Sequence, residues 1–484
     1  MSGMDIFDDT VTLVLLGALI LLIVPPAILV TVRRVTHAPF HAGSFRWIYL
    51  AWILIWGGSS VWNLTRDVRF SVDEAGADNY VRLILLSLGA LVILAIGARY
   101  RFAFLSELRA GVLGIFSFLA LWGLASTLWS ISPAGTLAKS FEYCAQLGLL
   151  VLATSLICGG TRAPRTRLLA LKSVFDWTWF WLCLSTALVY VGVLVWPDYA
   201  IMQDVGKLGF SLQGALPAVS ANGVGQLGAI LGIVALVRVV HSPRSRKVFI
   251  PILAISLLTM VLAQSRSPIL GFLLAVVVVL VASRRFGLLL FVSGLVGALL
   301  LSPYGLTIYE FLRRGQTDGT ISTLSGRTIY WEKSFQALQG NWLNGYGANV
   351  GGRYVLQTAL GEDEVSTTHS MYVETLIDTG IVGLILLLTG IVVTWFWLFK
   401  VRPYAMKDPI GRLLWLESFG VFTILMVRSV FSVSFIWSQT VLTFGLVLIF
   451  VAVMRKEVVQ RRYAAPSPAQ PLSAARRRRS SIRR

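Results

Sequence analysis

Residues 369–399 read HSMYVETLIDTGIVGLILLLTGIVVTWFWLF and pass from polar to almost wholly apolar. The apolar part, 373–399, is longer than the about 20 residues that an α-helix needs to cross the hydrocarbon core of a bilayer. It follows a long polar stretch, so its beginning is expected at the membrane surface. His369 therefore stands where a polar loop meets a membrane-spanning helix.

Similar apolar runs recur along the whole chain. They fall near 11–32, 47–62, 81–98, 110–130, 138–158, 173–196, 221–239, 248–263, 268–283, 287–303, 411–428 and 436–454. The chain is 56% hydrophobic and only 13% charged, whereas soluble domains carry about 25% charged residues. We predict an all-α polytopic integral membrane protein with about 12–13 transmembrane helices.

The charges of the connecting loops predict the orientation of these helices. If the helices alternate in direction, the basic loops all fall on one side, and the acidic N-terminus and the loop around Asp73 fall on the other. The basic loops are 33–46, 99–109, 159–172, 240–247, 284–286 and 400–410. Basic loops mark the cytoplasmic side. The large loop 304–372 is therefore expected to face outward, as are 197–220 and 264–267.

Four regions follow from this topology. They are N-terminal transmembrane helices (1–303), a large periplasmic loop (304–372), C-terminal transmembrane helices (373–454) and a basic cytoplasmic tail (455–484). We expect the tail to be disordered and its removal after Met454 to have a mild effect. The net charge is +19, but the basic residues lie in short loops and in the tail. This pattern suits contact with anionic membrane lipids and argues against nucleic acid as a partner.

Three residues predicted to face outward carry the chemistry of a candidate site. Arg266 lies in QSRSP (264–268), between two apolar runs with almost no loop. An arginine at membrane depth costs about 2.5–3.5 kcal/mol on insertion scales, so it is expected to face a cavity and meet an anion. Arg327 is expected in the first turn of an amphipathic loop helix that begins after Ser325, where backbone N–H groups also favour an anion. His369, one of four histidines, can accept a proton near neutral pH or donate to a phosphate oxygen once charged.

Each of these residues also has a plainer interpretation. Arg266 could extend to lipid headgroups, Arg327 could be solvated, and His369 could be hydrogen-bonded at the membrane surface. Together, however, two guanidinium groups and an imidazole at one surface suggest a bound diphosphate. A diphosphate leaving group needs such neutralisation as the bond to it breaks. The outward loops contain no Asp-x-Asp pair and no His/Cys cluster, so we expect no metal and no cofactor.

Other polar and aromatic residues in the outward segments are weaker candidates. Asn222 either caps the helix after loop 197–220 or faces the outer cavity. Trp331 and Tyr346 are candidates to stack on sugar rings, or are ordinary interfacial aromatics. Gly345 and Gly347 predict a tight turn.

Several acidic residues leave two interpretations open. Asp363 and Glu364 could hold a metal, although a solvated loop turn is the plainer interpretation. Four polar residues in apolar runs could form a proton relay, as in a transporter. They are Glu142, Asp176, Glu417 and Arg428. We favour structural pairs near the helix ends.

The string that begins at His369 resembles the signature of the O-antigen ligase family: His, then Asn, Ser or Gln, nine residues, Gly, two residues, then Gly, Thr or Tyr. The matching residues here are His369, Ser370, Gly380 and Gly383. The segments around Arg266 and from Arg327 to Gly347 also resemble the shared domain of the O-antigen ligase and polymerase superfamily. The resemblance covers about 205–400. Ala221 precedes Asn222 where the family usually has proline, which departs from the pattern.

The resemblance implies a metal-independent membrane glycosyltransferase of the bacterial inner membrane. It would take a glycan from undecaprenyl diphosphate on the periplasmic face and transfer it to a sugar hydroxyl of lipid A–core. His369 would activate the acceptor or contact the diphosphate, and Arg266 and Arg327 would bind the diphosphate. Asn222, Trp331, Tyr346 and Ser370 are the candidate substrate-binding residues, and Gly380 and Gly383 are the motif glycines.

Three alternatives remain open from the sequence. A polymerase of O-antigen or exopolysaccharide shares much of the histidine segment but joins lipid-linked repeat units, so its acceptor is another glycan. A polysaccharide or lipid transporter should show internal two-fold symmetry and charges at mid-depth, whereas the strongest candidates here lie in one long outer loop. A purely structural membrane protein would have no need of an arginine at position 266.

Overall fold

The computed structural model describes residues 44–60, 77–109, 111–159, 163–203, 208–215, 217–313, 327–360, 367–433 and 441–464. Twelve of the thirteen apolar runs lie on helices within these residues, and the run 11–32 lies outside them. The helices are α2 (Ser44–Ser59), α3 (Ala77–Arg99), α4 (Val112–Ala125), α5 (Pro133–Cys158), α6 (Pro164–Val195), α8 (Ala221–His241), α9 (Arg246–Leu262), α10 (Arg266–Ala282), α11 (Phe286–Leu301), α16 (Met371–Ala405), α17 (Pro409–Phe431) and α18 (Val441–Ala464).

Length and apolar composition support the membrane class. Seven helices in the described part of the chain are long and apolar enough to cross a bilayer, or eight if α11 and the bent segment after it form one span. This test counts fewer spans than the 12–13 predicted, partly because α2, α4 and α10 have only 16, 14 and 17 residues. The chain is an all-α, multi-pass membrane protein.

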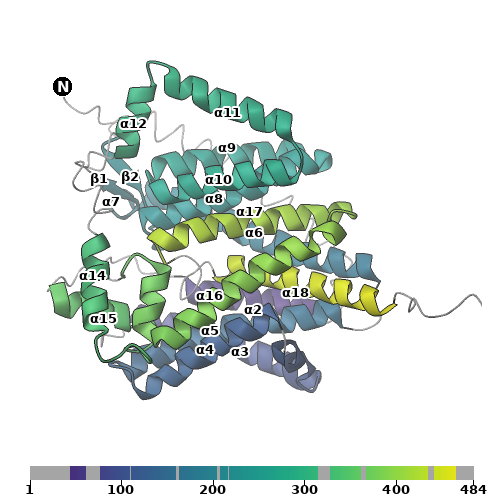
Figure 1. The fold of residues 1–484 in the computed structure, drawn as a ribbon, viewed down its shortest axis with the longest axis vertical. Coiled ribbons are helices and arrows are strands. Elements are labelled where there is room, and N and C mark those ends of the chain that lie inside the picture. Colours follow the sequence, from purple (N-terminus) through teal and green to yellow (C-terminus); the bar gives the residue numbers. More distant parts are fainter. Residues whose placement is uncertain are drawn as a thin grey trace, which may run out of the picture.

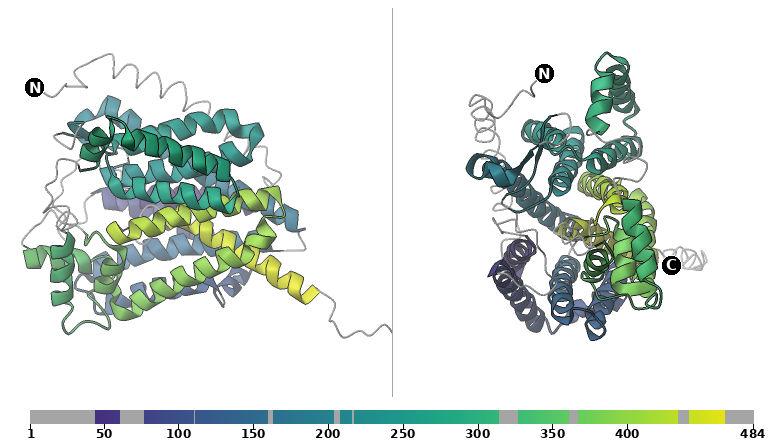
Figure 2. Two further views of the ribbon diagram at one scale, coloured as in Figure 1. Left: turned by 45° about the horizontal axis from the view of Figure 1, so that its top comes forward. Right: turned by 90° about the vertical axis from the view of Figure 1, so that its left-hand side faces the viewer.

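The helices form one bundle in which α8 and α17 are central (Figures 1 and 2). Buried residues make up 72% of the spanning window in α8 and 78% in α17, compared with 28% in α3. At the other extreme, α11 has no buried residue. The central helices are apolar on all sides, as expected for helices surrounded by other helices.

Short elements gather at one end of the bundle, which we call the loop end. They are α7 (Pro197–Ala200), β1 (Ile201–Gln203), β2 (Phe210–Leu212), α12 (Gly305–Arg313), α14 (Arg327–Ala337) and α15 (Gly351–Leu360). Figure 1 shows them on the left, where α8 and α16 begin. The strands β1 and β2 pair antiparallel, with Met202 opposite Ser211. The loops predicted to face outward therefore lie on one side of the bundle. Three short 3-10 helices connect long helices: η1 (Ala103–Arg109), η2 (Ser126–Leu128) and η3 (Pro243–Ser245).

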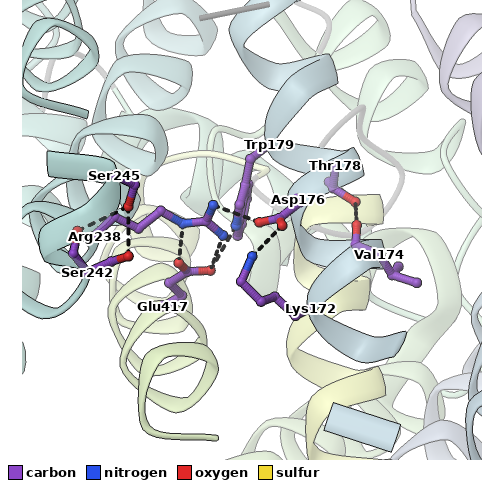
Figure 3. Close-up of polar contacts among 9 residues, drawn as sticks. All are labelled: Lys172, Val174, Asp176, Thr178, Trp179, Arg238, Ser242, Ser245 and Glu417. Atoms are coloured by element: carbon purple, nitrogen blue, oxygen red, sulfur yellow. Dashed lines mark hydrogen bonds and ion pairs between the residues drawn. The ribbon is translucent and has the colours of Figure 1, made fainter. Parts of the chain in front are cut away.

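A buried ion cluster joins α6, α8 and α17 nearer the opposite end (Figure 3). Arg238 pairs with Asp176 at 2.7 Å and with Glu417 at 2.6 Å, and Lys172 also contacts Asp176. The indole N–H of Trp179 donates to Glu417 at 2.8 Å. Asp176 and Glu417 are thus structural partners of one arginine, as favoured from the sequence. The cluster satisfies charges that would otherwise be costly to bury.

The C-terminal helix corrects the predicted start of the tail. α18 continues to Ala464, ten residues beyond Met454. In this extension Glu457 pairs with Arg167 at 2.7 Å, Lys456 pairs with Glu107, and Val458 is buried. Residues 455–458 are therefore part of the folded bundle, because they supply partners to charges on other elements. The remaining tail lies outside the described residues.

Candidate functional site

The site is built around a break in α16. Gly380 has φ 67° and ψ −170°, so the helix is interrupted inside the predicted membrane run. The interruption frees carbonyl groups, and the backbone N–H groups of Tyr346 and Gly347 donate to Ile377 and Asp378 at 2.8 and 2.9 Å. On the other side of the break, the Ile381 N–H donates to the Trp342 carbonyl at 2.8 Å. Loop segment 342–347 thus completes the hydrogen bonding of the broken helix.

Glycine is required at this junction because the two backbones touch. A Cβ atom on Gly380 would clash with the carbonyl of Leu343 and lie 2.6 Å from the Asn344 nitrogen. A Cβ atom on Gly345 would lie 2.7 Å from the Asp378 carbonyl carbon, and Gly345 also has a positive φ of 67°. The motif glycine Gly380 and the predicted turn glycine therefore permit one close contact between loop and helix.

The same loop is fixed to the α4–α5 corner. Trp122 and Trp129 donate their indole N–H groups to the carbonyls of Thr379 and Asn344 at 2.8 and 3.1 Å. The Ile131 N–H donates to the Tyr346 carbonyl at 3.1 Å. The hydroxyl of Tyr346 donates to the Ala337 carbonyl at 2.5 Å. Four segments distant in sequence are thus held at one place at the loop end.

Thr368, the residue before His369, is held by hydrogen bonds to two different helices. Glu374 accepts the backbone N–H and the hydroxyl of Thr368 at 2.8 and 2.7 Å. The indole N–H of Trp331 donates to the Thr368 carbonyl at 3.0 Å. His369 itself has φ 56°, a left-handed conformation that costs a non-glycine residue of order 1–3 kcal/mol and persists only where its surroundings enforce it. Ser370 is buried and is the N-cap position of α16, although its side chain makes no capping bond.

His369 is half-buried and lies near Arg327. Its ring is 6.2 Å from that of Tyr330, one helical turn into α14. Burial, and then the positive charge of Arg327, lowers the pKa of the His369 imidazole from 6.5 to about 4. The imidazole is therefore neutral at pH 7 in the unliganded protein, and one ring nitrogen can accept a proton.

Arg327 is the first described residue of α14, and the residues before it lie outside the described part of the chain. Its charge acts on His369 and also on Arg428, which is buried in the last turn of α17. Ser325, which was expected to cap this helix, lies outside the described residues, as do Asp363 and Glu364. The structure thus brings Arg327 and His369 together and adds a second arginine that the sequence had placed among structural pairs.

Arg266 begins α10 at a separate corner of the loop end. Its neighbour Ser265 donates to the side-chain oxygen of Asn222 at 2.5 Å. The N-cap of α8 is Ser220, which accepts the Gly223 N–H at 3.4 Å. Asn222 therefore does not cap the helix. It joins the first turn of α8 to the residue before Arg266.

Two acidic residues of α16 were missed by the sequence argument. Asp378 accepts the backbone N–H groups of Asn349 and Gly352 at 2.8 and 3.1 Å, and Glu374 holds Thr368. The charges of both act on Arg353, although burial lowers the pKa of that guanidinium. The available signal was that two carboxylates interrupt an apolar run four residues apart, on one face of a helix.

The comparison with known families covers this site. Residues 251–388 match the family described as O-antigen ligase. The matched segment contains Arg266, Arg327, His369 and both motif glycines, whereas Asn222 precedes it. No curated protein matches the chain. The resemblance to the O-antigen ligase and polymerase superfamily is confirmed over this segment.

Proposed function

We propose that this O-antigen ligase-type membrane protein transfers a glycan from undecaprenyl diphosphate to a sugar hydroxyl of lipid A–core. The loop end of the bundle would lie on the periplasmic side of the bacterial inner membrane, and the C-terminus in the cytoplasm. The positive-inside distribution of the basic loops supports this orientation. The partners would be the lipid-linked donor, the acceptor glycan and the surrounding lipids.

The observation that carries the proposal is a half-buried histidine in a left-handed conformation, held by the contacts of Thr368 and lying within the electrostatic influence of Arg327. His369 is uncharged at neutral pH because it is partly buried and faces the charge of Arg327. A neutral imidazole can take a proton, while a neighbouring arginine attracts the anionic donor. An arginine and a histidine that merely contacted lipid headgroups would not need a strained backbone held by Glu374 and Trp331.

In the proposed reaction His369 acts as a base and the arginines act on the leaving group. The acceptor hydroxyl gives its proton to an imidazole nitrogen, and its oxygen forms a bond to the anomeric carbon of the donor sugar. The bond from that carbon to the diphosphate oxygen breaks, and the diphosphate leaves with the electron pair. Arg266 and Arg327 neutralise the charge that develops on it, so no metal ion is required.

The remaining candidate residues receive positioning roles. Trp331 uses its indole N–H to hold Thr368, and Tyr346 uses its hydroxyl to hold Ala337. Asn222 fixes Ser265 and so the start of α10. Ser370 starts the helix that carries the motif glycines. The ring of Tyr346 also packs against the cluster of Leu338, Val355, Leu376 and Ile377, so it is fixed in place.

The test is transfer by the purified full-length protein in detergent, with undecaprenyl-diphosphate glycan and lipid A–core. Glycan on lipid A–core that disappears in His369→Ala would support the proposal. Lengthening of the lipid-linked glycan with lipid A–core untouched would identify a polymerase instead. His241→Ala is the matched control, because His241 lies at the opposite end of α8. Equal loss in both variants, or no transfer by the wild type, would contradict the proposal.

A further inference from the structure

Arg428 is the most unusual charge in the described part of the bundle. It is 1% exposed, and its Nε and Nη1 have no hydrogen-bond partner among the described residues. A last-turn arginine commonly bonds the final carbonyls of its helix. These two nitrogens do not. A guanidinium stays charged even when buried, so this position calls for an anion.

A cavity of about 310 Å³ lies beside Arg428, and we call it the Arg428 cavity. Its walls come from α2, α3, α5, α6, α8 and α17 and from the segment before α8. The volume is at the lower end of the range of small-molecule sites, roughly 300–1,000 Å³. The cavity can therefore hold one compact group.

Among the described residues that line the cavity, positive side chains outnumber negative ones. Arg82 and Lys139 both contact Glu142, at 3.3 and 3.2 Å, so one carboxylate is shared by two cations. Arg428 adds a third positive charge with no acidic partner among the described residues. Positive charge is therefore in excess among the lining residues that the structure describes, which favours an anionic ligand.

The uncharged lining is mixed, because Leu182, Val219 and Leu227 line the cavity beside polar residues that suit a sugar. Hydroxyl and amide groups face the cavity from several helices, and Trp56 supplies an indole. The residues that carry these hydroxyl and amide groups are Ser59, Ser60, Ser185, Ser220, Gln226 and Ser432. Hydroxyls, amides and one aromatic face are groups that hydrogen-bond to and stack on a sugar ring.

The cavity adjoins the proposed active site on two sides. Ser220 and Gln226 flank Asn222, which holds the residue before Arg266. Next to Arg428, Ser429 hydrogen-bonds Tyr372 at 3.0 Å, and Tyr372 follows His369 by three positions in the chain. A sugar in the cavity would therefore lie next to the place where the glycan reacts.

We propose that the Arg428 cavity binds an anionic sugar unit of one of the two glycan substrates, with Arg428 pairing with its carboxylate or phosphate group. This rests on the proposed function only in assuming that the ligand is a glycan. Arg82 and Lys139 would add to the attraction, and the hydroxyl groups would orient the ring. Substrates whose glycan is acidic would be preferred over neutral ones.

The experiment measures thermal stabilisation of the full-length protein in detergent by glucuronic acid, glucose 6-phosphate and glucose. Either acidic probe should raise the melting temperature, and glucose should not. The concentration needed should rise about tenfold or more in Arg428→Gln, which loses a charge-assisted pair. Stabilisation by glucuronic acid alone would indicate a carboxylate ligand, and stabilisation by glucose 6-phosphate alone would indicate a phosphate ligand. Arg412→Gln, in the first turn of the same helix, should bind like wild type.

Further variants and a lipid control distinguish binding at this cavity from glycan transfer and from binding of a membrane lipid. His369→Ala should abolish transfer yet bind the acidic probe normally, so each proposal can fail alone. Arg428→Lys keeps the charge and should fold and bind, more weakly than wild type. The proposal is overturned if neither acid stabilises the protein, if Arg428→Gln binds equally well, or if neither Arg428 variant folds. It is also overturned if phosphatidylglycerol in nanodiscs gives the same Arg428-dependent stabilisation as the sugars.

Discussion

The indole N–H of Trp331 donates to the carbonyl oxygen of Thr368 at 3.0 Å, which ties the helix that begins with Arg327 to the residue before His369. This bond joins two segments of the large loop that lie 37 positions apart in the chain. It sets the distance between the two groups that we assign to the reaction. Catalytic geometry of this kind tolerates little displacement.

Replacing Trp331 with Phe tests that bond while keeping an aromatic ring. We expect a stability loss of only about 0.5–1.5 kcal/mol, the usual net value of a hydrogen bond. Transfer should fall by more than this, by about tenfold or greater, because His369 loses its alignment. Steady-state transfer rates and melting curves measure both. Trp342→Phe is the control, since Trp342 is exposed on the same loop. Equal effects in the two variants would contradict the positioning role.

The pH dependence follows from the lowered pKa of His369. A base must be unprotonated, so kcat/KM should stay high below pH 6.5 and fall only toward about pH 4. Bound diphosphate offsets the charge of Arg327 and favours protonated imidazole, so the acidic limb of kcat should lie at higher pH than that of kcat/KM. Arg327→Gln should move the kcat/KM limb upward. If the acidic limb of kcat/KM lay at pH 6.5 in both the wild type and Arg327→Gln, His369 would not be a base whose pKa is lowered by Arg327.

Gly380→Ala should destabilise the protein by about 2–5 kcal/mol, because it adds a side chain at positive φ and against the backbone of Leu343. Denaturation monitored by circular dichroism measures this loss. Gly294→Ala is the control, since an added Cβ there meets nothing within 4 Å. It should be neutral or slightly stabilising, by at most about 1 kcal/mol. A stable Gly380→Ala protein would mean that the break in α16 can close.

Truncation should separate the folded part of α18 from the rest of the tail. A stop after Ala464 should leave stability and transfer near wild type. A stop after Met454 removes Glu457 and leaves Arg167 buried without its partner. Breaking such a pair costs about 3–5 kcal/mol. Expression level and melting temperature report the difference, and a harmless stop after Met454 would show that the Arg167–Glu457 pair contributes little.

Chelation tests the proposed division of roles. If Arg266 and Arg327 neutralise the leaving diphosphate, transfer should persist after dialysis against EDTA. The measurement is the transfer rate before and after dialysis, with magnesium added back as the control. Activity that is lost with EDTA and restored by magnesium would contradict the metal-independent mechanism and indicate Asp363 and Glu364 as metal ligands.

The sequence by itself determined the class and the layout of this protein. Membrane helices are encoded by local apolar length, so they can be found without tertiary contacts. The orientation that the loop charges indicate stays a prediction. The loop helix that carries Arg327 and the turn at Gly345 were predicted for the same reason. They depend on neighbours in the chain.

Only the tertiary structure decided what the polar groups do. Thr368 is held by Glu374 and Trp331, and Arg428 lies beside a cavity whose walls come from six helices. The charge state of His369 depends on its burial and on an arginine 42 positions earlier in the chain. Burial, electrostatic interaction and hydrogen-bond partners are set by distance in space. A sequence supplies the charged groups, but the folded bundle decides which of them keep an acidic partner.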